Sequence, residues 1–402
     1  MTALDLAAPP LRGRWAALAA VALARAAFGF QFQALPALAP ALKADLGLGL
    51  AEIGALTGLY MAPGLAVAVA GGALLQCIGV RELLAAGLAC MVAAGLLAAL
   101  SSDLGVQAGA RVMGGFGAAA ATVAGIKGAA DWFPLRELSL ANSLSGAAQP
   151  FGIGCALALF TALGPEADWR LALGATAVFA ALALVVALIA VPREARPVAG
   201  GPSPLAAARG VTRREWAALL SAGGLLAIYV GCFYGFLSLF PSWLAELGWP
   251  PARTALVSGA LGWAPVIVSP LGGLIAARTG RPGLVMAVCF VAWGACATLL
   301  PVVGPQLWLF GLMALFGPAP IGAVFSLPAR AVAPERMGLG AGVFTSFLYL
   351  GAAVMPALAG MVGERAAAEG GSAPAAAVAS CGLAFMLAVP MLGLFERFAR
   401  RG

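Results

Sequence analysis

Two arginines stand inside long apolar stretches of the sequence and are the residues best placed to do chemistry there. Arg25 and Arg111 each lie in a run with almost no other charge, and all 16 acidic residues fall between such runs or at their ends. A guanidinium stays protonated and offers five N–H donors in a planar fork, so it binds oxyanions well. The pair therefore indicates a site for an anion. The alternative is that backbone carbonyls and glutamine side chains satisfy both arginines.

Uncharged polar residues in the same apolar runs are further candidates to line this site. A hydroxyl or an amide in an apolar run needs a hydrogen-bond partner, which turns it toward the interior of a helix bundle. Together with the two arginines, the candidate substrate-binding residues are Gln33, Tyr60, Gln149, Tyr229, Tyr234 and Tyr349. The alternative for each of them is packing or hydrogen bonding between helices.

The residues of most enzyme and metal sites are missing or scattered. The chain contains no histidine, and its seven cysteines form no C-x-x-C pair. Histidine is the commonest general base and metal ligand, and closely spaced cysteines are the usual sign of a zinc or redox site. We therefore expect no metal ion, no cofactor and no enzymatic activity.

The elements that must position these residues are membrane-spanning helices. Of the 402 residues, 62% are hydrophobic and 10% are charged, and the mean hydropathy is +0.99. A water-soluble fold cannot bury that much apolar surface, which excludes soluble enzymes, secreted disulfide scaffolds and disordered chains. We expect an all-α membrane protein, because twelve runs are long enough to cross a bilayer. They cover residues 15–42, 53–76, 83–101, 105–126, 138–163, 170–191, 216–245, 254–277, 283–303, 306–329, 337–363 and 375–395.

The distribution of positive charge predicts the orientation of these helices. If the N-terminus lies in the cytoplasm, 17 of the 23 Lys and Arg residues fall in cytoplasmic segments and 4 fall on the opposite side. Short cytoplasmic loops of membrane proteins are enriched in Lys and Arg. We therefore expect a multi-pass protein of a bacterial inner membrane, with both termini in the cytoplasm.

The chain divides into two similar halves. Residues 192–214 are hydrophilic and rich in Pro, Gly and Arg, and they separate residues 1–191 from residues 215–402. A loop with glycines and arginine follows the second run of each half, and the two loops are offset by half of the chain. A duplicated six-helix unit with a site between its copies is typical of transporters. We expect two six-helix bundles joined by a cytoplasmic linker.

These loops and one motif in the fourth run resemble signatures of the major facilitator superfamily. The motif is Arg111-x-x-x-Gly115-x-Gly117, and the resemblance extends over essentially the whole chain. It implies the twelve-helix fold of that superfamily and a gating role for the two loops. The gating residues implied are Gly72, Gly79, Arg81, Gly273, Arg278, Gly280 and Arg281. The sequence departs from the family at Gln76 and Ala277, where an acidic residue is usual.

Other features are most similar to the anion-transporting branches of the superfamily, such as anion–cation symporters and nitrate and cyanate carriers. These features are Arg25, the loop that contains Asp45, and the segment Trp132-Phe-Pro-Leu-Arg-Glu. The symporter branch often has an acidic residue directly before the first arginine, where this sequence has Ala24.

We therefore expect a secondary transporter that moves a small anion, either inorganic or a small carboxylate, by alternating access. Its partners would be that anion and the lipid bilayer, with no nucleic acid, and it would act as a monomer. Because no run has a carboxylate at its centre, we expect no proton-coupling carboxylate in the protein. The main alternative is an exporter of drugs or apolar metabolites with the same fold. A membrane-embedded receptor or enzyme has little support in the sequence.

Overall fold

The protein is a bundle of helices that run side by side. The computed structural model describes residues 13–77, 79–133, 135–193, 211–333 and 336–399, without the side chains of residues 68–77, 130, 135–136, 138–140, 143 and 337–338. Within these ranges all regular structure is helical, and twelve helical segments are long and apolar enough to cross a membrane. The expected all-α fold with twelve spans is confirmed.

The first half of the chain forms one bundle. Its spans are α1 (Arg14–Ala37), α3 (Leu50–Cys77), α4 (Val80–Leu100), α5 (Leu104–Trp132), α6 (Leu135–Leu163) and α7 (Trp169–Ala190). The first span is shorter than predicted, because the chain bends after Ala37 into the short helix α2 (Ala39–Leu46). Within this bundle α1 packs against α6 and α7, and α4 packs against α5 and α7.

The second half forms another bundle with more interruptions. Its helices are α9 (Arg213–Glu246), α10 (Pro251–Thr279), α11 (Pro282–Val303), α12 (Leu307–Phe316), α13 (Ile321–Phe325), α14 (Leu327–Ala331), α15 (Met337–Ala368), α16 (Ala373–Met386) and α17 (Ala388–Phe398). The predicted span 306–329 is broken between α12 and α13, because the sequence Gly317-Pro-Ala-Pro320 cannot supply two of the backbone N–H groups that a helix needs there. Most of the predicted linker, residues 192–214, lies outside the described residues.

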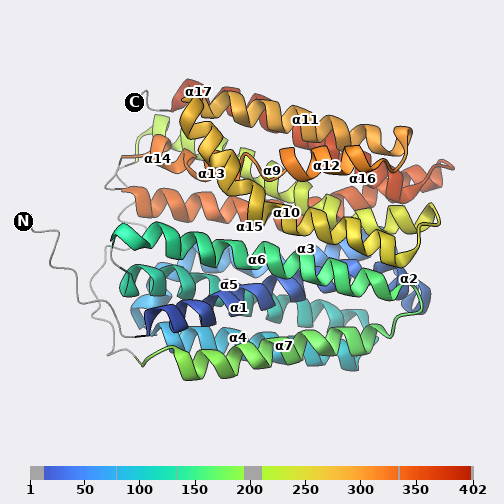
Figure 1. Ribbon diagram of the computed structural model, residues 1–402, viewed down its shortest axis with the longest axis horizontal. Coiled ribbons are helices and arrows are strands. Elements are labelled where there is room, and N and C mark those ends of the chain that lie inside the picture. The colour runs from blue at the N-terminus through green and yellow to red at the C-terminus, as the bar shows by residue number, and fades with distance from the viewer. Residues whose placement is uncertain (1–12, 78, 134, 194–210, 334–335, 400–402) are drawn as a thin grey trace, which may run out of the picture.

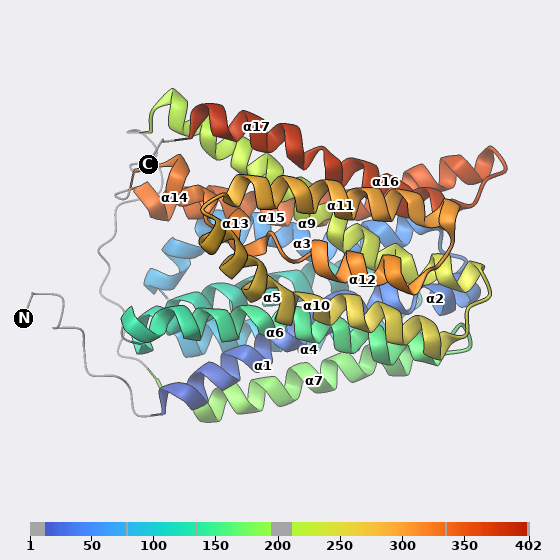
Figure 2. The same ribbon diagram turned by 45° about the horizontal axis from the view of Figure 1, so that its top comes forward.

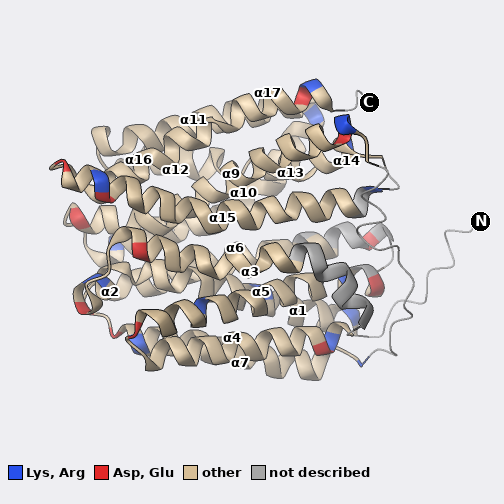
Figure 3. Ribbon diagram, turned by 180° about the vertical axis from the view of Figure 1, so that it is seen from behind, with Lys and Arg blue, Asp and Glu red and all other residues tan. Residues whose placement is uncertain are grey.

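Local capping explains several helix starts. Asp103 and Asp168 accept backbone N–H groups at the beginnings of α5 and α7, and Thr212 and Glu215 form a capping box at the beginning of α9. These caps satisfy N–H groups that have no partner within the helix. Charged residues gather at the two ends of the molecule and leave its middle almost uncharged (Figure 3).

The two bundles lie side by side and contact each other mainly through two helix pairs, α3 with α15 and α6 with α10, with smaller contacts of α1, α2 and α3 on α9 (Figures 1 and 2). The beginning of α1 and the end of α17 lie at one end of the molecule, and α2 lies at the other end (Figure 1). We call these the termini end and the α2 end.

The closest contacts between the bundles lie toward the α2 end. A methyl group added at Gly58 of α3 would lie 1.8 Å from the carbonyl oxygen of Ala353, and one at Gly360 of α15 would lie 2.5 Å from that of Leu50. On the other side, a methyl group at Gly262 of α10 would lie 2.7 Å from the Cα atom of Gly154. Glycine permits such close backbone approach between helices in membranes. We call these two contact zones, α3 with α15 and α6 with α10, the seal.

Hydrogen bonds strengthen the seal. The Glu364 carboxylate at the end of α15 accepts the backbone N–H of Ala51 at 2.9 Å, which satisfies a free donor in the first turn of α3. The Trp263 indole of α10 donates to the carbonyl oxygen of Phe151 at 3.2 Å. The bundles are therefore closed at the α2 end.

Candidate functional site

Arg25 lies in the middle of α1, on the side of the first bundle that faces the second. It is roughly 17 Å along the helix from either end of α1, so its charge sits at the depth of the membrane centre. Its Nε atom is enclosed and has no hydrogen-bond partner, and none of the described residues forms an ion pair with it. Arg25 still keeps partial solvent access. It is therefore a deep positive charge without a counter-charge.

Two tyrosines of the second bundle lie near Arg25. Tyr234 of α9 and Tyr349 of α15 are both within electrostatic range of its guanidinium. The Tyr349 ring packs directly on Gly64 of α3, where an added methyl group would lie 2.2 Å from a ring carbon. Gln149 of α6 donates to the Tyr234 hydroxyl at 3.4 Å. The structure thus brings together four of the predicted residues, Arg25, Gln149, Tyr234 and Tyr349, and we call them the inter-bundle site.

Gln33 lies between the same bundles but closer to the α2 end. Its side-chain amide donates to the carbonyl oxygen of Leu237 in α9 at 3.2 Å, and its own oxygen is enclosed without a partner. Gln33 is fully buried. Gln33 therefore lies in the closed region between the inter-bundle site and the α2 end, outside the site itself.

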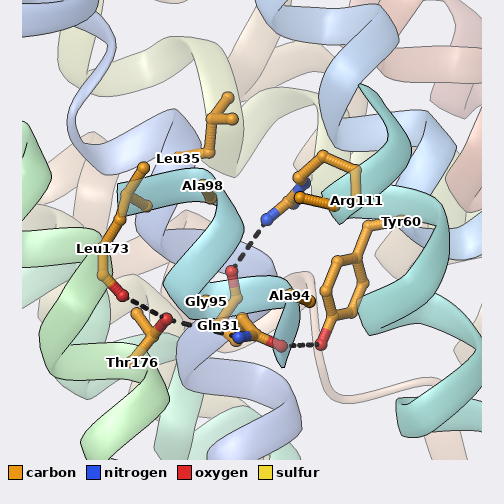
Figure 4. A pocket seen from close by; sticks show the side chains of 10 residues that line it. Gln31, Leu35, Tyr60, Ala94, Gly95, Ala98, Arg111, Leu173 and Thr176 are labelled. Carbon is orange, nitrogen blue, oxygen red and sulfur yellow. Dashed lines mark hydrogen bonds between the residues drawn. The ribbon is translucent and has the colours of Figure 1, made fainter. Parts of the chain in front are cut away.

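Arg111 has quite different surroundings, inside the first bundle (Figure 4). Its guanidinium donates to the carbonyl oxygens of Leu56 at 3.1 Å, Gln31 at 3.0 Å and Phe32 at 2.8 Å, and it stacks on the ring of Tyr60. The Phe32 oxygen needs an outside donor, because Pro36 has no N–H to give to the carbonyl four residues before it. The structure therefore assigns Arg111 a structural role in place of the expected substrate contact.

Tyr60 belongs to the same internal network. Its hydroxyl donates to the Gln31 side chain at 3.0 Å, and Gln31 donates in turn to Thr176 of α7 at 3.3 Å (Figure 4). These side chains line a small cavity with room for about one water molecule. The Tyr60 hydroxyl is thus engaged inside the first bundle, and its expected contact with substrate stays a prediction.

Tyr229 also has a structural partner within one bundle. Its hydroxyl donates to the carbonyl oxygen of Gly317 at 2.7 Å, at the break between α12 and α13. The N–H of Ile321 would normally satisfy that oxygen, but it bonds to Pro318 instead. The Tyr229 ring packs between Phe290 and Phe385. Tyr229 thus stabilises a broken span, and we do not retain it as a substrate contact.

The predicted gating loops lie at the termini end, away from the seal. Arg81 donates to the carbonyl oxygen of Leu188 and so ties α4 to α7 within the first bundle. Gly280 adopts a left-handed conformation (φ 62°) at the end of α10, which explains why glycine stands there.

The remaining predicted gating residues make no contact between the bundles that the structure describes. Arg278 and Arg281 are exposed beside Gly280, and an added methyl group at Gly273 would meet no atom within 4 Å. Gly72 lies in the part of α3 whose side chains are outside the described residues. The gating role of all seven residues stays a prediction.

Sequence reasoning missed several residues that the site depends on. Trp263 fills the gap over Gly154, Glu364 joins α15 to α3, and Phe32 packs on Tyr234 with ring centroids 5.3 Å apart. Aromatic residues are common throughout an apolar sequence, and a carboxylate near a helix end is also ordinary. Nothing in the sequence therefore distinguishes these three residues from others of their type. No group of three or more Cys, Asp or Glu residues in the described part of the chain could hold a metal ion.

A family model settles the classification that this architecture suggests. The model of the major facilitator superfamily matches residues 21–356, more than four-fifths of the chain. The chain belongs to the major facilitator superfamily. No curated protein matches the sequence of this major facilitator transporter.

Solved structures with the same fold cover almost all of this major facilitator transporter. A bacterial homologue of the human lysosomal transporter Spinster, inward-facing and unoccupied, has a TM-score of 0.74 at 17% identity over 97% of each chain. Its inward-facing and occupied form gives 0.69 at 18% identity over 95% of each chain. The human organic anion transporter MFSD10 (TETRAN) gives 0.64 at 18% identity, over 96% of this chain and 100% of that one. At such low identities the likeness shows the fold alone.

Proposed function

We propose that this major facilitator transporter carries a small anion, inorganic or a small carboxylate, through the inter-bundle site by alternating access. The observation that supports the proposal is the unneutralised guanidinium of Arg25. An isolated charge at the membrane centre costs at least about 2.5–3.5 kcal/mol, and an anionic substrate would remove most of that cost. A neighbour of the same fold is an organic anion transporter, which is consistent with the proposal.

We further propose that the structure represents the inward-facing state of a monomer in a bacterial inner membrane. The closest described approaches between the bundles, at Gly58, Gly360 and Gly262, lie toward the α2 end. The excess of Lys and Arg in segments at the termini end favours a cytoplasmic location for that end. The anion would then enter or leave from the cytoplasm in this state, and the seal would have to separate in the opposite state.

The alternative is an exporter of drugs or apolar metabolites. The aromatic pair of Phe32 and Tyr234, with ring centroids 5.3 Å apart, would suit an apolar cargo. An apolar molecule would leave the Arg25 charge without a partner, however, so this arrangement favours an anion.

Uptake into liposomes that contain the purified protein tests the proposal. Radiolabelled acetate, benzoate and phosphate serve as probes. The variant Arg25→Gln removes the charge but keeps a polar side chain, and we expect it to lower uptake of the transported probe at least about tenfold, the loss of one charge-assisted hydrogen bond or more. Arg253→Gln is the matched control, because Arg253 is exposed at the α2 end, where it stacks on Trp249.

Equal uptake of every probe by the wild-type protein and the Arg25→Gln variant would remove Arg25 from the mechanism. A pH-sensitive dye trapped in the same liposomes tests the expected lack of a proton-coupling carboxylate. The described acidic residues lie at or near helix ends, so we expect no proton uptake comparable to the substrate flux. A proton flux that matches the substrate flux would contradict this part of the proposal.

A further inference from the structure

The inter-bundle site contains a single positive charge. Arg111, the other arginine deep in the membrane, is held by three carbonyl oxygens inside the first bundle. All other described Lys and Arg residues lie at or near the ends of the molecule. A substrate in the site would therefore meet one guanidinium, that of Arg25, and no second cation among the described residues.

The second bundle contributes hydroxyl groups to the same place. The Tyr234 hydroxyl accepts a hydrogen bond from Gln149 at 3.4 Å, and its own O–H is not donated to any described residue. Tyr349 of α15 lies within electrostatic range of Arg25 and beside Thr122 of α5. Both hydroxyls could therefore donate to an oxygen bound at Arg25.

The wall next to these groups is aromatic. Arg25 and Phe32 are seven residues apart on α1, which places them two turns apart on one face of the helix. Phe32 and Tyr234 contact each other across the bundles with ring centroids 5.3 Å apart. The polar groups thus lie on one side of the site and the aromatic rings on the side toward the α2 end.

We infer that the site selects a monovalent oxyanion with an apolar body, such as a monocarboxylate. One carboxylate would bind Arg25 of the first bundle and the hydroxyls of Tyr234 and Tyr349 of the second, and the body would pack on the ring of Tyr234, which Phe32 supports from behind. This inference rests on the proposed function and narrows its substrate class.

The charge balance explains why a second negative charge is excluded. A monoanion at Arg25 makes the pair neutral, so the bundles can close over it. A dianion leaves one negative charge unpaired in an apolar space, and burial of an unpaired charge is strongly unfavourable. We therefore expect a dianion to bind at least about tenfold more weakly than a monoanion of the same shape.

Thermal unfolding of the detergent-purified full-length protein tests this inference with matched pairs of probes. The pairs are benzoate with phthalate and propionate with malonate, at about pH 8, well above carboxyl pKa values. A ligand that binds the native state raises the melting temperature according to its concentration and affinity. In at least one pair, we expect the monoanion to raise the melting temperature at a concentration about tenfold lower than the dianion needs for the same rise.

Variants connect the shift to the site. Tyr234→Phe and Tyr349→Phe keep the rings and remove the hydroxyls. Each should weaken binding of the monoanion about three- to tenfold, because one hydrogen bond to it is lost. Arg25→Gln should abolish the shift. Tyr229→Phe is the matched control, because the Tyr229 hydroxyl bonds to Gly317 within the second bundle, and it should keep the wild-type shift relative to its own baseline.

The possible failures have different meanings. A dianion that binds as well as its monoanion, with a shift lost in Arg25→Gln, would overturn the inference and leave anion transport intact. If both tyrosine variants keep the monoanion-induced rise in melting temperature, the hydroxyls of Tyr234 and Tyr349 do not donate to the ligand and that part of the inference is wrong. A shift that survives in Arg25→Gln would overturn both the inference and the proposed function. No shift with any of the four carboxylates would overturn the inference alone, because the proposed function also includes inorganic anions.

Discussion

The carbonyl oxygen of Phe32 explains why two similar arginines have different roles. Pro36 leaves this oxygen without its helical donor, and Arg111 supplies one from α5 at 2.8 Å. Arg25 on the same helix α1 has no carbonyl or carboxylate partner among the described residues. One arginine thus stabilises the bundle, and the other is free to bind a substrate.

The variant Arg111→Lys tests this assignment. An ammonium group on a flexible stem cannot reach three carbonyl oxygens and stack on Tyr60 at once, so the variant should lose at least about 2 kcal/mol of stability. We expect a lower melting temperature in detergent but an anion-induced shift of normal size. Arg278→Lys, at an exposed position, serves as the control. A stable Arg111→Lys variant that no longer responds to anions would instead show that Arg111 binds the substrate.

The sequence predicted both arginines but could not separate their roles. Each is a single charge in an apolar run, and the difference depends on which backbone oxygens lie nearby in space. The same holds for the tyrosines. Tyr229 satisfies a carbonyl at a helix break, whereas Tyr234 lies at the inter-bundle site, although only five residues separate them on α9.

At the scale of helices, the hydropathy of the sequence predicted all twelve spans, because length and apolar content alone determine a membrane crossing. The irregular parts were not predicted. The bend after Ala37 and the break after Phe316 depend on prolines, and prolines also occur inside unbroken spans here, as at Pro63 and Pro150. The glycines of the seal could not be distinguished from other glycines before their neighbours across the bundle were known.

Gly58→Ala tests the seal. The added methyl group would lie 1.8 Å from the Ala353 carbonyl oxygen, so we expect it to disfavour the sealed state by about 1–3 kcal/mol. Spin labels at the exposed positions Lys43 and Glu369, in a protein without its native cysteines, report the separation of the two bundles at the α2 end. We expect a population at longer distance in this variant.

Two further variants make this experiment decisive. Gly360→Ala alters the seal on the side of the second bundle and should give the same population at longer distance. Agreement between the two variants would show that the effect does not come from a local folding defect at Gly58. Gly109→Ala is the matched control, because a methyl group there would meet no atom within 4 Å. Wild-type distance distributions in both seal variants would mean that the glycine contacts do not hold the bundles together.

At the scale of the whole molecule, the seal and the inter-bundle site together describe one stage of alternating access. The closest described contacts between the bundles lie toward the α2 end, and the site lies near the middle of the helices. An anion bound between Arg25 of one bundle and the tyrosines of the other would join the two halves as they move. The empty carrier keeps an unpaired charge at this position, and the loaded carrier does not.

The most direct measurement is an experimental structure of the protein with 4-bromobenzoate, whose bromine can be located by anomalous scattering. The account predicts a bromine peak between α1, α9 and α15, on the Phe32 side of Arg25, with the carboxylate on the Arg25 guanidinium. A peak elsewhere, a carboxylate bound at Arg111, or a site at Arg25 that stays without the ligand would contradict it.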